Sequence, residues 1–300
     1  MNVNKVQAME KKPYILTTSH WGTVKEREYR LAVLPWGATE AHNFHLPYGT
    51  DNFETESLVH EAAGMAWEAG AKLVVLPTMP VGVNTGQADI YMTLNIHPGT
   101  QQAILEDIAG GIYRHGIHRL LVVNGHGGND FRQILREVGS RLPGMLLVTC
   151  DWFRSVEKEL FFDHPGDHAD EMETSLMLYT RPDMVLPLEQ AGPGRARQFR
   201  VEALNESWAW TERKWSRVTS DTGIGNPGKA SVEKGEAYFK AVTGKLAGLM
   251  TGLALTEDEE LYTDPPGPKD PTEPKDPAEP KGSSGSSAPS SVNTRSGDDE

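Results

Sequence analysis

Four short apolar runs recur along the first half of the chain, and a segment with helical periodicity follows most of them. The runs are Arg30–Pro35, Ala71–Thr78, Arg119–Val123 and Met145–Thr149. Continuous apolar runs of this length, bounded by turn residues, are typical of strands buried on both faces. Helices are predicted at about residues 52–69, 101–114, 130–140 and 232–253. The alternation predicts an α/β fold, with a mainly parallel central sheet and helices on both faces.

Composition narrows the class of protein. The 300 residues carry a net charge of −13, which argues against nucleic acid or an anionic membrane surface as a partner. The single cysteine, Cys150, excludes an internal disulfide, fits a reducing compartment and leaves His, Asp and Glu to hold any metal. No run of about 18 apolar residues occurs, and the first residues lack the apolar core of a signal peptide. We therefore expect a cytoplasmic protein without a membrane span.

The end of the chain has a different composition. From about Thr263 it is rich in Pro, Lys, Asp, Ser and Gly, with an imperfect P-K-D-P repeat and few apolar residues. Such a segment cannot bury enough apolar surface to fold. We expect one folded domain over residues 1–262 and a disordered tail over residues 263–300.

The stretch Trp36–Asp51, W-G-A-T-E-A-H-N-F-H-L-P-Y-G-T-D, is the first candidate site. It places acidic and imidazole side chains between a predicted strand and a predicted helix, namely Glu40, His42, His45 and Asp51. Ligands of open α/β sheets bind at that end of the strands, and carboxylates with imidazoles suit zinc, manganese or iron. A solvated polar loop is the alternative interpretation.

A second imidazole follows the third predicted strand, in Asn124–Asn129, N-G-H-G-G-N. Its glycines would let the backbone approach a ligand closely. A phosphate cradle is one rival interpretation, although the loop has no P-loop lysine, and an ordinary tight turn is another. Because His126 and the first motif both occupy strand ends, together they favour a metal site.

A third polar segment, Asp163–Ser175, precedes an apolar helical run. Its candidates are His164, His168, Asp170, Glu171 and Glu173. Acidic residues at a helix start also favour the helix dipole, which would account for Glu171 and Glu173 without any function.

Two further features concern substrate contacts. Trp152 follows the fourth predicted strand, where it could stack on a flat substrate or pack in the core. The Gly- and Asn-rich segment Met79–Asn95 predicts a long loop of the kind that shapes sites.

These motifs together resemble the creatininase family of metal-dependent amidohydrolases. The resemblance rests on G-A-T-E-A-H-N-F-H-L-P-Y-G-T-D, N-G-H-G-G-N, H-A-D-E-M-E-T-S and G-K-A-S-V-E-K-G-E, in the family's order over roughly residues 30–250. It implies a creatininase-like three-layer sandwich. It also implies two divalent metal ions, with zinc in first place and manganese or iron as alternatives, and a homo-oligomer, with a hexamer suspected.

The resemblance also implies roles for individual residues. Glu40 and His42 would each supply one ligand to one of the two metals, Asp51 would bridge the metals, and His126 would complete the ligands of the first ion. The chain departs from creatininase at Gly127 and Gly128, where creatininase is expected to have a tyrosine and a metal-binding glutamate.

Glu173 is therefore the candidate replacement ligand. By the same resemblance, His168 would transfer protons and Trp152 would bind substrate. The nearby acid Glu171 is the alternative proton donor, and Asn129 is a second candidate for binding substrate.

The expected reaction is attack of a metal-activated water on a carbonyl, because metal coordination lowers the pKa of water toward about 7. The bond would be a non-peptide C–N amide bond, in particular a cyclic one, of a small molecule. Alternatives are a formamide, a cyclic ketone, or a non-catalytic metal-binding scaffold. A serine hydrolase is not indicated, since no G-x-S-x-G motif occurs.

Overall fold

The computed structural model describes residues 12–164 and 166–264. Within them, a four-stranded sheet has the order β2-β1-β3-β4. All three pairs of neighbouring strands are parallel. The strands are β1 (Leu31–Trp36), β2 (Leu73–Val75), β3 (Arg119–Asn124) and β4 (Leu146–Asp151). The predicted parallel α/β sheet is confirmed.

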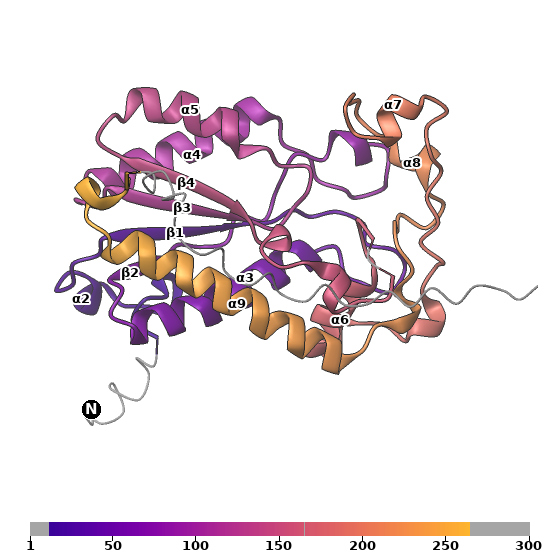
Figure 1. Cartoon of the computed structure of the whole chain (residues 1–300), viewed down its shortest axis with the longest axis horizontal. Coiled ribbons are helices and arrows are strands. Elements are labelled where there is room, and N and C mark those ends of the chain that lie inside the picture. Colours follow the sequence, from indigo (N-terminus) through magenta and orange to yellow (C-terminus); the bar gives the residue numbers. More distant parts are fainter. Residues whose placement is uncertain (1–11, 165, 265–300) are drawn as a thin grey trace, which may run out of the picture. The chain divides into compact units, whose positions relative to one another are not determined.

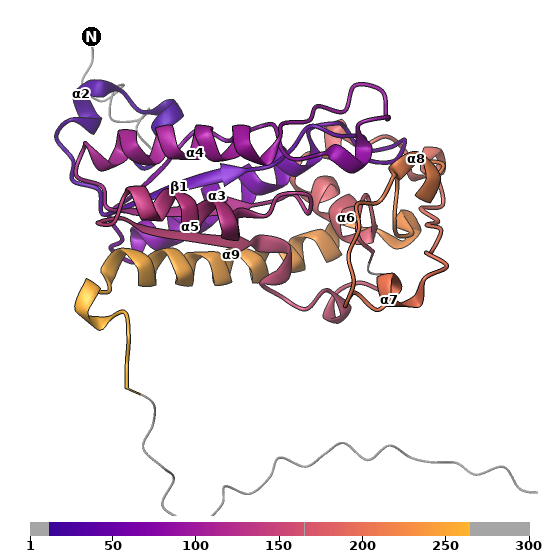
Figure 2. The same ribbon diagram turned by 90° about the horizontal axis from the view of Figure 1, so that it is seen from above.

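Helices cover both faces of this sheet (Figures 1 and 2). Helices α4 and α5 pack on one face, and α3, α6 and α9 belong to the apolar cluster on the other. The bounds of these helices are α3 (Thr50–Glu68), α4 (Pro98–Tyr113), α5 (Phe131–Arg141), α6 (Glu171–Thr180) and α9 (Val232–Leu255).

Strand β1 explains why the sequence shows continuous apolar runs. Leu31 and Val33 pack in the cluster that includes α3 and α9, whereas Ala32 and Leu34 pack in the cluster that includes α4 and α5. Successive side chains of a strand point to opposite faces, so a strand covered on both faces has no position for a polar residue.

The strand order creates a natural place for a ligand. After β1 the chain returns to pair β2 on one side of it, and later returns to pair β3 on the other. The connections that leave the carboxyl ends of β1 and β3 therefore separate, and the crevice between such strands is where open α/β sheets bind ligands. The first two sequence motifs follow these two strands.

Boundaries differ from the predictions mainly at β2. Its ladder covers Leu73–Val75 rather than the predicted Ala71–Thr78. Leu76 still donates its N–H to the Val33 carbonyl (2.8 Å), but Pro77 has no N–H to continue the ladder.

Shorter elements fill the connections. They are η1 (Leu16–Thr18), α2 (Trp21–Val24), η2 (Thr85–Gln87), η3 (Trp152–Arg154), η4 (Lys158–Leu160), η5 (Pro182–Met184), η6 (Leu188–Gln190), α7 (Glu202–Asn205), α8 (Trp215–Val218), η7 (Pro227–Lys229) and η8 (Asp258–Glu260). Among the described residues, none of the helices combines the length and apolarity needed to cross a bilayer. The predicted disordered tail lies, from residue 265 onward, outside the described residues.

Candidate metal centre

A glycine brings the first motif close to helix α3. A Cβ atom at Gly37 would lie 2.3 Å from Asn52 Oδ1 and 2.9 Å from the Asn52 backbone nitrogen. Asn52 Nδ2 also donates to the Ala38 carbonyl (2.7 Å). The chain that leaves β1 is thus held against the first turn of α3.

This packing aligns Glu40 and His42 with Asp51. The loop closes where the Glu40 N–H donates to the Tyr48 carbonyl (3.1 Å). Asp51 occupies the first turn of α3, where the helix dipole favours a negative charge. All three site side chains are buried, each at most 2 % exposed.

The side chain of Asn124 holds the second motif at His126. Asn124 Oδ1 accepts from the His126 N–H (3.1 Å), and Asn124 Nδ2 donates to the His126 carbonyl (2.9 Å). A Cβ at Gly128 would lie 2.2 Å from the Val83 carbonyl oxygen and 2.4 Å from His126 Nε2. As packed here, Gly128 has no room for a side chain, so a carboxylate ligand has to come from another segment.

The third motif supplies His168 and Glu173. Residue His168 is held by paired backbone hydrogen bonds with Ile224, at 3.0 and 2.8 Å. Asp170 caps helix α6, because its Oδ1 accepts from the Met172 N–H (2.9 Å) and the Glu173 N–H (3.0 Å). The cap fixes the helix turn that carries Glu173.

The three motifs converge on Asp51. Its Oδ1 lies 2.8 Å from His42 Nε2, and its Oδ2 lies 3.1 Å from His126 Nδ1. Glu40 Oε1 lies 2.8 Å from the same His126 Nδ1. One buried cluster thus contains four residues whose first and last members lie 86 positions apart in the sequence, namely Glu40, His42, Asp51 and His126.

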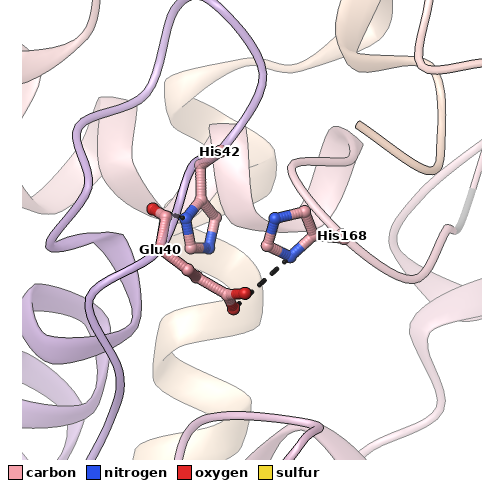
Figure 3. A group of neighbouring side chains, drawn as sticks. All are labelled: Glu40, His42 and His168. Carbon is pink, nitrogen blue, oxygen red and sulfur yellow. Dashed lines mark hydrogen bonds and ion pairs between the residues drawn. The ribbon is translucent and has the colours of Figure 1, made fainter. Parts of the chain in front are cut away.

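Glu173 on helix α6 and His168 just before that helix complete the cluster. Glu173 Oε2 lies 3.9 Å from His42 Nε2, and His168 Nδ1 lies 3.8 Å from Glu40 Oε1. The His42 and His168 rings stack at a tilt, with centroids 4.1 Å apart. Figure 3 shows these two rings beside the Glu40 carboxylate.

Each of the three histidines has one ring nitrogen on a backbone carbonyl. A carbonyl oxygen only accepts, so this nitrogen donates, and the other nitrogen of the neutral ring carries a lone pair. In every case that second nitrogen faces a carboxylate, which also only accepts. The carbonyl partners are Glu40 for His42 (3.0 Å), Val83 for His126 (3.0 Å) and Ala41 for His168 (2.8 Å).

Two such acceptors do not attract each other unless a cation or a proton lies between them. Among the described residues, His42 Nε2 and Asp51 Oδ2 are buried without a hydrogen-bond partner. A histidine that donates one nitrogen to a carbonyl and presents the other is also the usual arrangement at metal sites. The donor set therefore fits divalent metal ions.

Without a metal, protons take this role. Burial lowers the pKa of His42, but the carboxylates of Asp51, Glu173 and Glu40 outweigh it and raise that pKa to about 10. Burial likewise opposes a charge on His126, yet Glu40 and Asp51 raise its pKa well above the ordinary value.

The pKa values of His168 and Glu173 are also displaced, and each shift favours the neutral form of the group. Burial and the nearby His42 lower the pKa of His168. Burial raises the pKa of Glu173 to about 8, although His42 opposes the shift. Strongly displaced pKa values of this kind are typical of functional sites.

Three sets of ligand atoms lie close enough to hold an ion. Within each set, the candidate atoms are within 4.8 Å of one another, counting only the described residues. Asp51 belongs to two of the sets. The sets are Glu40–Asp51–His126, His42–Asp51–Glu173 and Glu40–His42–His168.

The chain is similar to known proteins over most of its length. Residues 17–250 match the model of the creatininase family, described as creatinine amidohydrolase. The chain belongs to the creatininase family. A creatinine amidohydrolase from Pseudomonas putida is 28% identical over 192 residues, which cover 54% of this chain and 71% of that protein.

Solved structures of family members share the fold. A protein from Bacteroides fragilis, provisionally named a creatinine amidohydrolase, is 40% identical, with a TM-score of 0.79 over 84% of this chain and 100% of its own. A manganese form of creatininase is 21% identical, with a TM-score of 0.67 over 82% of this chain and 100% of its own. Other creatininase structures include a Zn–Zn form and a complex with creatine.

Within this creatininase-family chain, other predicted residues lie outside the cluster. Glu171 is fully buried and forms an ion pair with Lys234, while its Oε2 accepts from the His164 N–H (2.7 Å). His45 turns its Nε2 toward Thr174 Oγ1 (2.9 Å). Neither belongs to the three candidate ligand sets of the described residues.

The two predicted substrate contacts are engaged by the protein itself. Trp152 packs in the apolar cluster with α3 and α9, 1 % exposed, and its Nε1 donates to Thr55 Oγ1 (3.0 Å). Asn129 Oδ1 accepts from the Val83 N–H (3.0 Å) and from Gln101 Nε2 (2.9 Å). In this structure Asn129 holds the Val83 segment, whose carbonyl in turn binds His126.

A cavity of about 650 Å³ lies against Glu40, His126 and His168. Its aromatic lining consists of Phe131, Trp210 and Trp215, and does not include Trp152. The Trp215 ring meets the His168 ring edge-on, with centroids 5.5 Å apart. The Trp-rich stretch Trp208–Trp215 stands out in the sequence as a candidate lid or interface, but its lack of regular periodicity does not place it at this cavity.

Two buried polar residues near the centre, Gln87 and Glu54, are not among the candidates predicted from the sequence, although Gln87 lies in the predicted loop Met79–Asn95. The Gln87 side chain donates to Glu40 and lines the cavity. Glu54, one turn after Asp51 on α3, has both carboxylate oxygens buried without a hydrogen-bond partner in the described residues. Burial, and then the charges of Glu173 and Asp51, raise its pKa well above the ordinary value. The i, i+3 spacing from Asp51 was the available signal for Glu54.

Proposed function

We propose that this protein is a metal-dependent hydrolase that cleaves a non-peptide C–N amide bond, in particular a cyclic one, of a small molecule. The observation that carries the proposal is the orientation of the three imidazoles. Each donates one nitrogen to a backbone carbonyl and presents the other to a carboxylate. Such a cluster needs a positive charge at its centre, and divalent cations bound by His and carboxylate groups supply it.

The proposed ligand sets share one carboxylate. One ion would be held by Glu40, Asp51 and His126, and a second by His42, Asp51 and Glu173. Zinc is the first choice, with manganese or iron as alternatives. Ions of this kind lower the pKa of a bound water and polarise a carbonyl group.

The remaining steps belong to residues of the chain. His168 has a lowered pKa, so its ring is neutral at pH 7 and its Nδ1 can accept a proton and later deliver it to a leaving nitrogen. Its position is fixed by the Nε2 bond to the Ala41 carbonyl (2.8 Å) and by the Trp215 ring. Trp215 is 8 % exposed and shields this side of the site from water.

The size of the cavity supports a small substrate, since about 650 Å³ is within the range of small-molecule sites. Its wall carries charged side chains of both signs. Arg213 carries its guanidinium 4.7 Å from the centre of the Trp215 ring and pairs with Asp167 at 2.5 Å. A formamide or a cyclic ketone remains the alternative substrate, and a non-catalytic metal-binding scaffold is the alternative function.

A combined metal and substrate experiment tests the proposal. The purified protein is loaded with zinc or manganese, its metal content is measured, and a panel of small lactams, formamides and cyclic ketones is assayed. His126→Ala should lose bound metal and activity together, whereas His115→Ala, an exposed histidine, should keep both. A protein that holds no stoichiometric metal, or a loaded one that opens no amide, would contradict the proposal.

Two further predictions concern the whole protein. By analogy with the family, we propose that it forms a homo-oligomer, with a hexamer as the first expectation, and that it acts in the cytoplasm. Sedimentation velocity at micromolar concentration tests the first, and fractionation of the source cells tests the second.

A further inference from the structure

Gln87 contacts the candidate metal centre through the Glu40 carboxylate. It ends the 3-10 turn η2, is 3 % exposed, and its Nε2 donates to Glu40 Oε2. Glu40 uses its other oxygen, Oε1, toward His126 and His168. Because a carboxylate only accepts hydrogen bonds, the amide of Gln87 has one possible orientation, with its NH₂ group on Glu40.

This orientation leaves the other end of the amide without a partner. Gln87 Oε1 is buried and accepts no hydrogen bond from any described residue. Gln87 also lines the cavity, together with Glu40 and His168. A buried acceptor without a donor costs about 1–3 kcal/mol, and a ligand that brings a donor to this wall recovers that cost.

We propose that Gln87 is a substrate-binding residue that selects molecules with an N–H donor next to the carbonyl group to be attacked. This inference rests on the proposed function and names its substrate class: secondary amides and lactams, as opposed to N-alkylated amides, esters and cyclic ketones. Both ends of one side chain then act together, since the NH₂ group holds a metal ligand and the oxygen orients the substrate. A ketone or an N-alkylated amide would leave Oε1 unpaired, and a site built to bind a hydrogen-bonding group rejects analogues that lack it.

Three five-membered rings test the proposal by binding alone. 2-Pyrrolidinone carries the N–H, N-methyl-2-pyrrolidinone replaces it with a methyl group, and cyclopentanone replaces it with CH₂ without added bulk. Their dissociation constants are measured on the zinc-loaded full-length protein by ligand-observed NMR. The wild type should bind 2-pyrrolidinone about ten-fold more tightly than the other two.

Matched variants test whether the preference depends on Gln87 itself or on a general disturbance of the fold. Gln87→Met keeps the length of the side chain and should bring the three constants to within about two-fold of one another. Gln101→Met is the control, because Gln101 is also a fully buried glutamine with an unpartnered Oε1, but it does not line the cavity. That variant should keep the ten-fold preference. Gln87→Ala is the second variant if the Gln87→Met protein fails to fold.

Equal binding of the three rings to the wild type, no binding of any of them, or a preference that survives in Gln87→Met would each overturn the inference. Failure of this inference and failure of the proposed function give different results. A Gln87-dependent preference in a protein that hydrolyses no amide leaves the inference standing and removes the hydrolase. Amide hydrolysis with no N–H preference does the reverse.

Discussion

Asp170 and Asp51 are both buried, at 0 and 2 % exposure, yet their surroundings differ in kind. Asp170 accepts from three backbone N–H groups, those of Met172, Glu173 and Gly166. Asp51 faces ring nitrogens of His42 and His126 that carry lone pairs when neutral. Fixed backbone donors satisfy the first carboxylate within the fold, whereas the second needs a cation or a proton from outside.

The groups around each carboxylate thus distinguish a structural acid, Asp170, from a candidate metal ligand, Asp51. Burial alone does not distinguish them, and neither does position, because both lie at a helix N-terminus. What distinguishes them is whether the groups around the carboxylate can donate. The same test assigns Glu171 to the structural class, since Lys234 and the His164 N–H occupy its two oxygens.

The largest expected effect is on metal binding. Asp51→Asn removes the carboxylate shared by both proposed ligand sets, so metal affinity should fall by more than about 100-fold, measured by competition with a chelating dye. Retained stoichiometric metal would remove Asp51 from the centre.

The matched change at the cap should act on stability instead. Asp170→Ala leaves three backbone N–H groups without their acceptor, and the free energy of unfolding should fall by about 2 kcal/mol. Urea denaturation of the metal-free protein measures it. If the variant instead kept its stability and lost only metal, the comparison between the two acids would be wrong.

The pH dependence of the metal-free protein sharpens the comparison further. The pKa of His42 is raised to about 10 and that of Glu173 to about 8. A group whose pKa is raised on folding stabilises the folded protein below its unfolded pKa, and this contribution is lost as the pH rises through the folded value. The metal-free protein should therefore be less stable at pH 9.5 than at pH 7, by about 1 kcal/mol or more.

Bound metal should remove this pH dependence of stability, and the affinity for the metal should change with pH in the opposite direction. Protons on His42 and Glu173 compete with the ion, so metal affinity should rise with pH across the neutral range. Urea titrations of metal-free and zinc-loaded protein at the two pH values test both statements. Equal stability of the metal-free protein at pH 7 and 9.5 would contradict the assigned proton positions.

The smallest expected effect concerns Glu171, predicted from the sequence as an acid that assists proton transfer. Because its oxygens serve Lys234 and the His164 N–H, Glu171→Gln should cost about 1 kcal/mol of stability and leave kcat nearly unchanged. His168→Gln should reduce kcat strongly in the same assay. A large loss of kcat in Glu171→Gln, with metal content and fold intact, would restore the catalytic role.

Much of the fold could be predicted because β1 and β3 are buried on both faces, and a strand in that position must be continuously apolar. The structure shifts their ends by a residue, to Leu31–Trp36 and Arg119–Asn124. Predictions were weaker for the connection before α9, where α7 and α8 are single turns held by contacts distant in the chain. Trp215 illustrates this, since it meets the ring of His168, which lies far from it in the chain.

The sequence by itself determined the order of strands and helices, the family, and which histidines and acids are available at the strand ends. These follow from periodicity and from motifs, which are local properties of the chain. The tertiary structure decided which nitrogen of each histidine faces a carboxylate, that Trp152 packs in the core, and that Gln87 meets Glu40 from 47 positions away. Those outcomes depend on which atoms the fold brings within hydrogen-bonding distance, and no spacing along the chain encodes that distance.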